Sequence, residues 1–360
     1  MKSNHLVEIH EFLHNNTTFS SVVSGLRKKS PQKISSNKSS FGFIISTLSK
    51  LLKVPSVVIT SNPEESIEIL DSINFWSTST SNLNFTERNE IFLEKYKPDN
   101  KSVKDRMRCL EALFTDKFQN KTPIICTSIQ SLSTKTLSRD NFENLSINLQ
   151  IGNKINQKDF IDSLIKAGYK NSSIVESVGQ FAKRGDIVDL FCLSEQNPVR
   201  IDFFYDEIES IKIFETSTQK SYKNIKKIFI SPVQETFIFQ ELNKMKDLNH
   251  KFFDQIQIDE EKKIFEDFKS IRRSENDELI NYYSGFFDNG SLFDYMKNET
   301  LIVKIDDYNL DLELSLTDKK REENYISKLE QKTIKKMFPI PYLEKNEITK
   351  AFNSKKNLLV

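Results

Sequence analysis

Two short apolar runs, each preceded by a stretch of helical periodicity, restrict what the first part of this chain can fold into. VVIT at 57–60 follows the helical pattern FIISTLSKLL at 43–52, and PIICTS at 123–128 follows RMRCLEALF at 106–114. Short β-branched runs without polar alternation are typical of strands that are buried on both faces. Strands that alternate with helices predict a parallel sheet covered on both sides.

The periodicity changes after residue 128. KDFIDSLIKAGY at 158–169 predicts a short helix that ends at Gly168, where a left-handed residue is favoured. VRIDFF then alternates apolar and polar residues, YDE forms a turn and IESIKIF returns, so Val199–Phe214 is predicted to be a β-hairpin. One helix beside antiparallel strands predicts a small α+β domain.

Beyond Pro232 the chain is helical and charged, and ETLIVKID at 299–306 predicts a strand that rejoins the first sheet. We therefore expect an α/β domain in two sequence halves, residues 1–134 and 236–360, around an inserted α+β domain at 135–235. The final NLLV has the pattern of a strand that is cut off, so the chain is expected to be an N-terminal fragment or a shortened protein.

Charge and hydropathy exclude several classes of function. The chain has 52 Lys and Arg against 51 Asp and Glu, so its net charge of +1 provides no global attraction to nucleic acid or to an anionic membrane. No apolar run approaches the roughly 20 residues of a membrane span, and MKSNHLVEIH lacks the apolar core of a signal peptide. We expect a cytoplasmic protein with no membrane partner.

Metal binding is not expected either. Cys109, Cys126 and Cys192 lie far apart among apolar neighbours and lack CxxC spacing, so they are predicted to be buried thiols. His10 and His14 have the i, i+4 spacing of two metal ligands, but their neighbourhood offers no third ligand.

A nucleotide phosphate would bind before the FIISTLSKLL helix, where backbone N–H groups and a lysine could hold it. The sequence there, SVVSGLRKKSPQKISSNKSSFGF, contains Gly25 and Gly42 but no G-x-x-x-x-G-K-[ST] motif, so no nucleotide or magnesium cofactor is expected. The basic residues of this stretch could contact DNA phosphates or belong to a solvated loop. They are Arg27, Lys28, Lys29, Lys33 and Lys38.

No catalytic constellation is present in the sequence. Histidine does not occur near a serine in a G-x-S-x-G turn, and Cys192 follows a strand rather than opening a helix. Asp186, Asp189 and Asp202 are expected to complete turns and cross-strand salt bridges rather than to form a catalytic acid pair. The chain is therefore predicted to be a binding protein and not an enzyme.

The segment from Gly168 to Glu235 resembles a segment of the UvrB/Mfd family. The shared pattern is GY, GxFxxRG, R-[IV]-[DE]-F-F and DEIES, seen here in GYKNSSIVESVGQFAKRGDIVDLF and NPVRIDFFYDEIESIKIF. EKYKPDNKSVKDRMRCLEALF and GSLFDYMKNETLIVKID are similar to further stretches of the family. The resemblance implies a degenerate helicase-type parallel-sheet domain with an inserted small domain.

Within the family, the chain resembles the Mfd branch, because UvrB would carry an intact phosphate loop and a Tyr-rich hairpin that grips damaged DNA. The resemblance implies a non-catalytic adaptor of transcription-coupled repair that recruits UvrA to a stalled RNA polymerase. It assigns contact with RNA polymerase and duplex DNA, and the hydrolysis of ATP, to other domains. The alternatives are a UvrB-type helicase with a degenerate loop and a direct DNA-binding module that uses the basic stretch.

The resemblance also assigns the UvrA contact to charged residues around the RG turn and the hairpin. Arg184 matches the arginine of the RG turn, with Lys183 beside it, and Arg200 and Asp202 match the charged residues of the R-[IV]-[DE] strand. Arg200 and Asp202 are expected to point to solvent and to form, with Arg184, a patch suited to a partner's carboxylates. The alternative is that Arg184 bonds backbone carbonyls at the bend and that Arg200 and Asp202 are an ordinary surface pair.

The chain departs from the family pattern at two positions of this segment. Ala182 stands where UvrB has arginine, which is expected to weaken or shift the contact. Tyr205 stands where the family often has glycine, which is expected to change only the geometry of the hairpin turn.

Overall fold

The computed structural model describes residues 16–77, 82–88, 93–95, 99–115, 122–193, 195–235, 242–273, 275–287, 289–353 and 356–359. The chain divides into two compact units. Unit 1 comprises Met1–Thr136 and Gln240–Val360, and unit 2 comprises Leu137–Phe239. Unit 2 is thus one continuous stretch that interrupts the sequence of unit 1.

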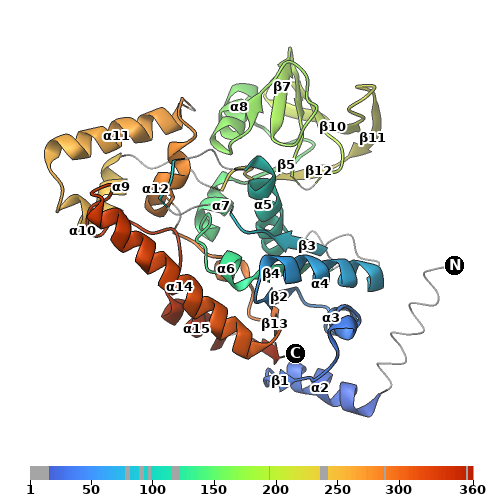
Figure 1. Ribbon diagram of the computed structural model, residues 1–360. Helices are drawn as coiled ribbons and strands as arrows, with labels where there is room; N and C mark the ends of the chain where they lie inside the picture. The colour runs from blue at the N-terminus through green and yellow to red at the C-terminus, as the bar shows by residue number, and fades with distance from the viewer. Residues whose placement is uncertain are drawn as a thin grey trace. The chain divides into compact units, whose positions relative to one another are not determined.

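Unit 1 contains a six-stranded sheet in which all the described pairings are parallel (Figure 1). The two predicted apolar runs form central strands of this sheet, and every residue of both strands is buried, as expected for a sheet covered on both faces. The predicted parallel sheet is confirmed, as is the return of 299–306 to it. The order across the sheet is β1 (Gln32–Lys33), β14 (Lys356–Leu359), β13 (Leu301–Lys304), β2 (Ser56–Thr60), β4 (Ile124–Ser128) and β3 (Asn82–Phe85).

Helices α2 (Thr17–Arg27), α3 (Phe41–Leu52) and α4 (Pro63–Trp76) share one core with the apolar side chains of β2, β4 and β13. Helix α4 begins where the Asn62 side chain accepts a hydrogen bond of 2.9 Å from the Glu65 backbone N–H, with Pro63 in the first turn. The connection from β2 to β3 passes over β4, and the one from β3 back to β4 runs the opposite way through α5 (Asn100–Phe114). Right-handed crossovers therefore place α4 and α5 on opposite faces of the sheet.

The remaining helices of unit 1 lie mostly after the insertion. Helices α10 and α12 gather Phe252, Phe253 and Phe286 into an aromatic cluster that Phe268 of α11 joins with edge-to-face ring contacts. No helix of the described residues is long and apolar enough to cross a membrane. The bounds are η1 (Lys38–Ser40), α6 (Ile129–Leu132), α9 (Leu242–Leu248), α10 (His250–Phe253), α11 (Ile258–Arg272), α12 (Leu279–Phe287), α13 (Leu292–Tyr295), α14 (Asp307–Glu330) and α15 (Lys345–Asn353).

Unit 2 contains a second six-stranded sheet and a small two-stranded one. The predicted hairpin is confirmed as β9 (Val199–Phe204) and β10 (Glu207–Phe214), and the sheet is antiparallel except where β6 pairs with β7 in parallel. The order is β11 (Ser221–Ile225), β10, β9, β8 (Ile187–Leu190), β7 (Gln180–Arg184) and β6 (Lys170–Asn171), and β5 (Ile147–Gln150) pairs with β12 (Lys227–Ile230).

Two helices accompany these strands where the sequence predicted one. The predicted helix is α8 (Gln157–Lys166), and Gly168 follows it with φ +87°, in the expected left-handed conformation. The additional α7 (Arg139–Leu145) is only seven residues long and buries a single side chain, Phe142, so it has too little apolar periodicity to be recognised.

Candidate partner-binding surface

The Arg-Gly-Asp stretch of the sequence is the tight turn between β7 and β8. Arg184 pairs with Ile187 across the two strands, so Gly185 and Asp186 form the connection. Gly185 has φ +60°, and a Cβ atom built on it would meet nothing within 4 Å. The glycine is therefore required by the left-handed backbone and not by a close neighbour. The Asp186 carbonyl accepts a hydrogen bond of 2.9 Å from the Phe203 backbone N–H, which fixes the turn beside β9.

Cross-strand pairing defines one face of the large sheet of unit 2, which we call the outer face. Ile187 pairs with both Arg184 and Asp202, and Arg200 pairs with Asp189, so these residues share a face. On the opposite face Val199, Ile201 and Phe203 are buried, and the Phe203 ring lies 5.7 Å from that of Phe160 in α8. The predicted alternation of apolar and polar faces in VRIDFF is confirmed.

Arg184 is exposed on the outer face, as expected. Its Nη2 donates a hydrogen bond of 2.9 Å to the backbone carbonyl of Ser173, which lies after β6 and not at the Gly185 bend. The rest of the guanidinium fork faces solvent. Lys183 is also exposed, but successive side chains of a strand point to opposite faces, so it projects away from the outer face.

Arg200 is not free in solvent, which corrects the expected orientation of this side chain. Its Nε and Nη2 donate to the two carboxylate oxygens of Asp189 at 2.7 and 2.8 Å, and its guanidinium lies 4.8 Å from the centroid of the Phe214 ring. Only 20% of the Arg200 side chain and 2% of Asp189 are exposed. The hydrogen bonds to Asp189 raise the pKa of Arg200 above its ordinary value.

Asp202 is likewise held by neighbours on β10. The Lys212 ammonium lies 2.6 Å from its carboxylate, and the Ser210 hydroxyl donates to the same oxygen. Burial acts to raise the pKa of Asp202, but the hydrogen bonds from Lys212 and Ser210 outweigh it, so the pKa lies below its ordinary value. The prediction that Asp189 and Asp202 form cross-strand salt bridges is confirmed, and Arg200 and Asp202 do not pair with each other.

Two exposed aromatic residues stand at the tip of the β9–β10 hairpin; the sequence pointed to Tyr205 only as a change of turn geometry and did not single out Phe204. Phe204 is 63% exposed and Tyr205 86%, with their ring centroids 4.9 Å apart. Tyr205 occupies the turn with φ +54°, which explains why glycine suits this position. The sequence signal for the exposure of Phe204 was the alternation of side chains along VRIDFF, which puts Phe204 on the same face as Arg200 and Asp202.

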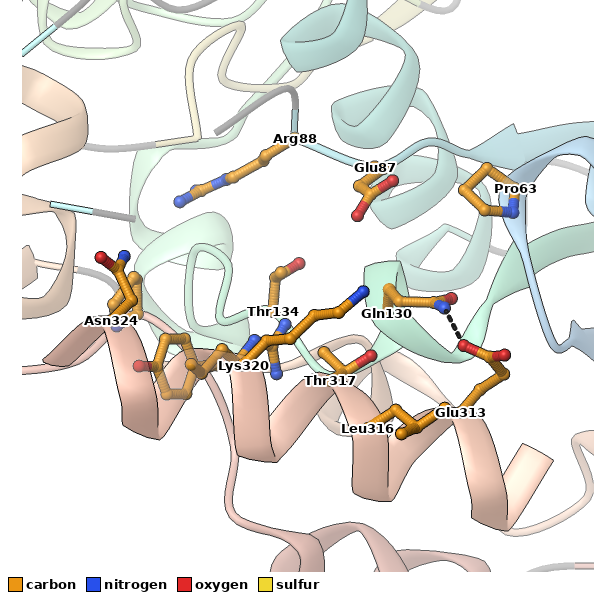
Figure 2. Close-up of a pocket in the computed structure, with 13 residues that line it drawn as sticks. Pro63, Glu87, Arg88, Gln130, Thr134, Glu313, Leu316, Thr317, Lys320 and Asn324 are labelled. Carbon is orange, nitrogen blue, oxygen red and sulfur yellow. Dashed lines mark hydrogen bonds between the residues drawn. The ribbon is translucent and has the colours of Figure 1, made fainter. Parts of the chain in front are cut away.

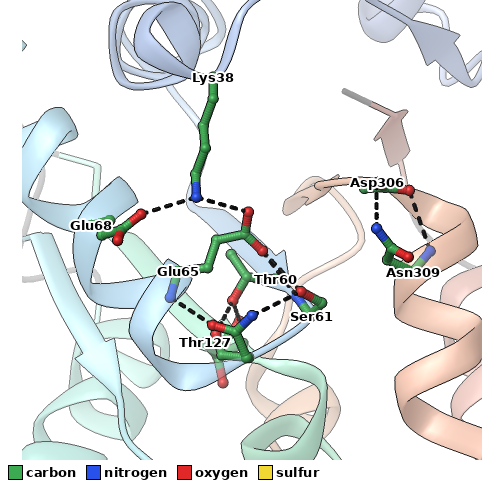
Figure 3. Close-up of polar contacts among 9 residues, drawn as sticks. Lys38, Thr60, Ser61, Glu65, Glu68, Thr127, Asp306 and Asn309 are labelled. Carbon is green, nitrogen blue, oxygen red and sulfur yellow. Dashed lines mark hydrogen bonds and ion pairs between the residues drawn. The ribbon is translucent and has the colours of Figure 1, made fainter.

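The lysine of the loop before α3 is engaged by two carboxylates. The ammonium of Lys38, from the Lys-Ser pair, lies 2.9 Å from a carboxylate oxygen of Glu68 and 3.4 Å from one of Glu65, both on α4 (Figure 3). The hydrogen bond to Glu68 raises the pKa of Lys38. Asp306, after β13, accepts hydrogen bonds from Asn309 at the start of α14 (Figure 3). The charges next to this loop are therefore already engaged within the protein.

The other basic residues of this stretch are exposed on three different local structures. Arg27 ends α2 and donates to the Leu51 carbonyl at 3.4 Å, Lys28 and Lys29 form the turn after it, and Lys33 lies on the edge strand β1. Gly42 serves packing and not a loop, because a Cβ atom there would lie 2.2 Å from the Ser72 hydroxyl of α4.

The three cysteines are buried and free, as predicted. Burial raises the pKa of the Cys109 thiol well above its ordinary value, so it is poorly suited to act as a nucleophile. His10 and His14 lie outside the described residues. Among the residues that are described, no group of three or more acidic, histidine or cysteine side chains could hold a metal ion.

The fold and this surface define a class of protein. Residues 147–236, all of them within unit 2, match the family model of the UvrB interaction domain. Over a longer stretch, the chain is similar to transcription-repair-coupling factors, which supports a UvrB-like module.

Three such relatives illustrate the similarity. The transcription-repair-coupling factor of Bacillus subtilis (strain 168) is 23% identical over 335 residues, which are 89% of this chain and 28% of the relative. That of Myxococcus xanthus is 26% identical over 206 residues, 56% of this chain and 17% of the relative. That of Staphylococcus aureus (strain bovine RF122 / ET3-1) is 32% identical over 140 residues, 39% of this chain and 12% of the relative. The chain thus spans at most 28% of the length of these relatives.

Proposed function

We propose that this chain is a non-catalytic adaptor of transcription-coupled nucleotide excision repair and that it binds UvrA through the outer face of unit 2. Support comes from the match to the UvrB interaction domain and from the similarity to transcription-repair-coupling factors. The observation that carries the proposal is that the outer face presents an exposed cation, Arg184, and an exposed aromatic ring, Phe204, with exposed Tyr205 in the adjoining hairpin turn. RNA polymerase binding, duplex DNA binding and ATP hydrolysis are assigned to other parts of a longer protein.

The composition of this surface fits a protein partner. Arginine and aromatic side chains contribute most of the binding energy in many interfaces, and the fork of Arg184 suits a carboxylate on UvrA. Arg200 and Asp202 take part indirectly, because their ion pairs with Asp189 and Lys212 hold β8, β9 and β10 in one arrangement before binding. Lys183 projects from the opposite face, so only its long-range charge could favour encounter with an acidic surface.

A binding experiment tests the proposal. Purified UvrA is titrated against the chain, its Phe204→Ala and Arg184→Ala variants, and a Lys158→Ala control on the exposed side of α8. We expect Phe204→Ala and Arg184→Ala each to weaken binding at least tenfold, at about 1.4 kcal/mol per factor of ten, and the control to match the parent chain. Equal binding by all four proteins would show that the surface is assigned wrongly.

The alternative is a UvrB-type helicase with a degenerate phosphate loop. It predicts ATP hydrolysis stimulated by DNA, whereas the adaptor hydrolyses none. The ion pairs of Lys38 with Glu65 and Glu68 favour the adaptor, because they occupy the ammonium that a nucleotide phosphate would need. An ATPase assay with single-stranded and duplex DNA separates the two functions.

A further inference from the structure

Unit 1 has a pocket, lined by several charged residues, that the proposed function does not use. Its volume is about 400 Å³, within the range of small-molecule sites, and all its lining residues belong to unit 1 (Figure 2). Pro63 at the start of α4, Gln130 of α6 and the chain after β3 form one side. One long face of α14 forms the other.

The pocket lies where doubly wound sheets usually bind ligands. Strands β2 and β4 are neighbours in the sheet. The chain runs from β2 to β3, which lies toward one edge of the sheet, and from β4 to its next strand in this sheet, β13, which lies toward the other edge. The carboxyl ends of β2 and β4 therefore flank a topological switch point, and ligands in open α/β sheets bind in the crevice at such a point. Pro63 and Gln130 follow these two strand ends directly.

Three cationic side chains reach this pocket from two directions. Arg88, which comes from the chain after β3, is 7% exposed, and Lys320 comes from α14 (Figure 2). Arg321 follows Lys320 on the same helix and also lines the pocket. Arg321 is held in place, since its Nη1 donates to the Ser133 hydroxyl at 3.0 Å and its guanidinium lies 4.4 Å from the centroid of the Tyr342 ring. Lys320 has neither a hydrogen bond nor an ion pair with any residue that the structure describes.

Two carboxyl groups share the lining, and Arg321 also forms an ion pair of 3.8 Å with Asp318, so Lys320 is the positive charge that this proposal depends on. Glu313 accepts a hydrogen bond of 3.4 Å from Gln130, and the Oε1 of Gln130 is buried without a hydrogen-bond partner among the described residues. Burial raises the pKa of Glu87, although Arg321 acts to lower it. A ligand that brings a doubly negative group to the cations and hydroxyl donors to Glu87, Glu313 and Gln130 would satisfy both sides of the pocket.

We propose that this pocket binds a phosphate monoester of about the size of a sugar phosphate, with its phosphate group between Arg88, Lys320 and Arg321 and its hydroxyls toward the carboxylates. A phosphate dianion matches several converging cations better than a single carboxylate does. The same chemistry occurs in a free sugar phosphate and at the 5′-phosphorylated end of a nucleic-acid strand, and the test below separates these two sources.

The test uses the full chain in calorimetric titrations with ribose 5-phosphate, ribose and inorganic phosphate. We expect saturable one-to-one binding of ribose 5-phosphate, binding of inorganic phosphate at least tenfold weaker, and none of ribose. Lys320→Gln should weaken the affinity for ribose 5-phosphate about tenfold, as expected for one lost contact of roughly 1.4 kcal/mol. The control Lys319→Gln, whose residue is 73% exposed and pairs with Glu323, should change it less than twofold.

A competition experiment identifies the source of the phosphate. Displacement of ribose 5-phosphate by a 5′-phosphorylated oligonucleotide, but not by the same strand without the phosphate, would assign the site to strand ends. Equal displacement by both strands would overturn the proposal, as would the lack of ribose 5-phosphate binding at 10 millimolar or equal weakening by Lys319→Gln. UvrA binding is measured in parallel and should be unchanged by Lys320→Gln, so the two proposals can fail separately.

Discussion

Arg200 and Asp189 form a bidentate ion pair across β8 and β9, with donor-acceptor distances of 2.7 and 2.8 Å. Because the Asp189 side chain is only 2% exposed, removing its partner leaves a nearly buried carboxylate without compensation. Arg200→Met is therefore expected to lower the free energy of unfolding by about 3 kcal/mol, as urea denaturation would measure. The double variant Arg200→Met/Asp189→Asn should recover a large part of this loss.

The same variants distinguish a structural role of Arg200 from a direct contact with UvrA. If the ion pair only holds the strands in place, the double variant binds UvrA nearly as well as the parent chain once it is folded. A double variant that is stable but fails to bind would show that the Arg200 guanidinium itself contacts the partner.

Asp202 makes the stability of unit 2 depend on pH. Its pKa in the folded protein is below the ordinary value of 3.8, so the folded carboxyl binds its proton more weakly than the unfolded one. Its stabilising contribution is therefore complete above pH 3.8 and is lost as the pH falls through the lower folded value. In urea titrations, the stability difference between the parent chain and Asp202→Asn should shrink from pH 6 to pH 3. A difference that stays constant would contradict this assignment.

Replacing Tyr205 with glycine should raise the stability of the fold and weaken the binding of UvrA. A left-handed backbone costs an L-residue about 1–2 kcal/mol, so Tyr205→Gly should raise the free energy of unfolding by about 0.5–1 kcal/mol after the entropy of glycine is subtracted. Almost no buried area is lost, because the side chain is 86% exposed. The variant should nevertheless bind UvrA more weakly. Tyr222→Gly, in strand β11, is the matched control and should be destabilised.

The basic residues before α3 allow a separate test of the DNA-binding alternative. Lys28, Lys29 and Lys33 are exposed, so changing all three to glutamine should leave the fold intact. If they contact DNA phosphates, duplex affinity falls with salt at a slope of about −0.9 per contact, and the triple variant has a slope smaller by roughly 2.7. We expect the parent and the variant to show equally weak binding, with the same slope, in fluorescence anisotropy titrations.

Strands β2, β4 and β13 could be predicted from the sequence because a strand at the centre of a covered sheet is buried on both faces and is therefore a continuous apolar run. Strand β3 could not, since NLNF places Asn82 and Asn84 in a short edge strand where β propensity is low. Helix α2 was also missed, because its Ser and Thr residues favour helices weakly. Its buried residues Phe19, Val22, Val23 and Leu26 have helical spacing, which was the available signal.

The candidate surface was predictable only in part. Local pattern predicts the turn at Gly185 and the exposure of Arg184, but the ion-pair partners of Arg200 and Asp202 depend on strand register, which sequence alone does not provide. The pocket beside α14 could not be foreseen, because Arg88 and Lys320 are far apart in the sequence and line one pocket only once unit 1 has folded.

The pairing of β2 with β13, where Val57 lies beside Ile302, has a consequence for synthesis on the ribosome. All of unit 2 is translated before β13, so the interaction domain can complete its own sheet while β2 still lacks a neighbour on one edge. An unpaired edge of an apolar strand is a template for wrong pairing. The nascent chain therefore exposes this edge for at least the time that the ribosome takes to translate residues 129–304, of which unit 2 is the larger part.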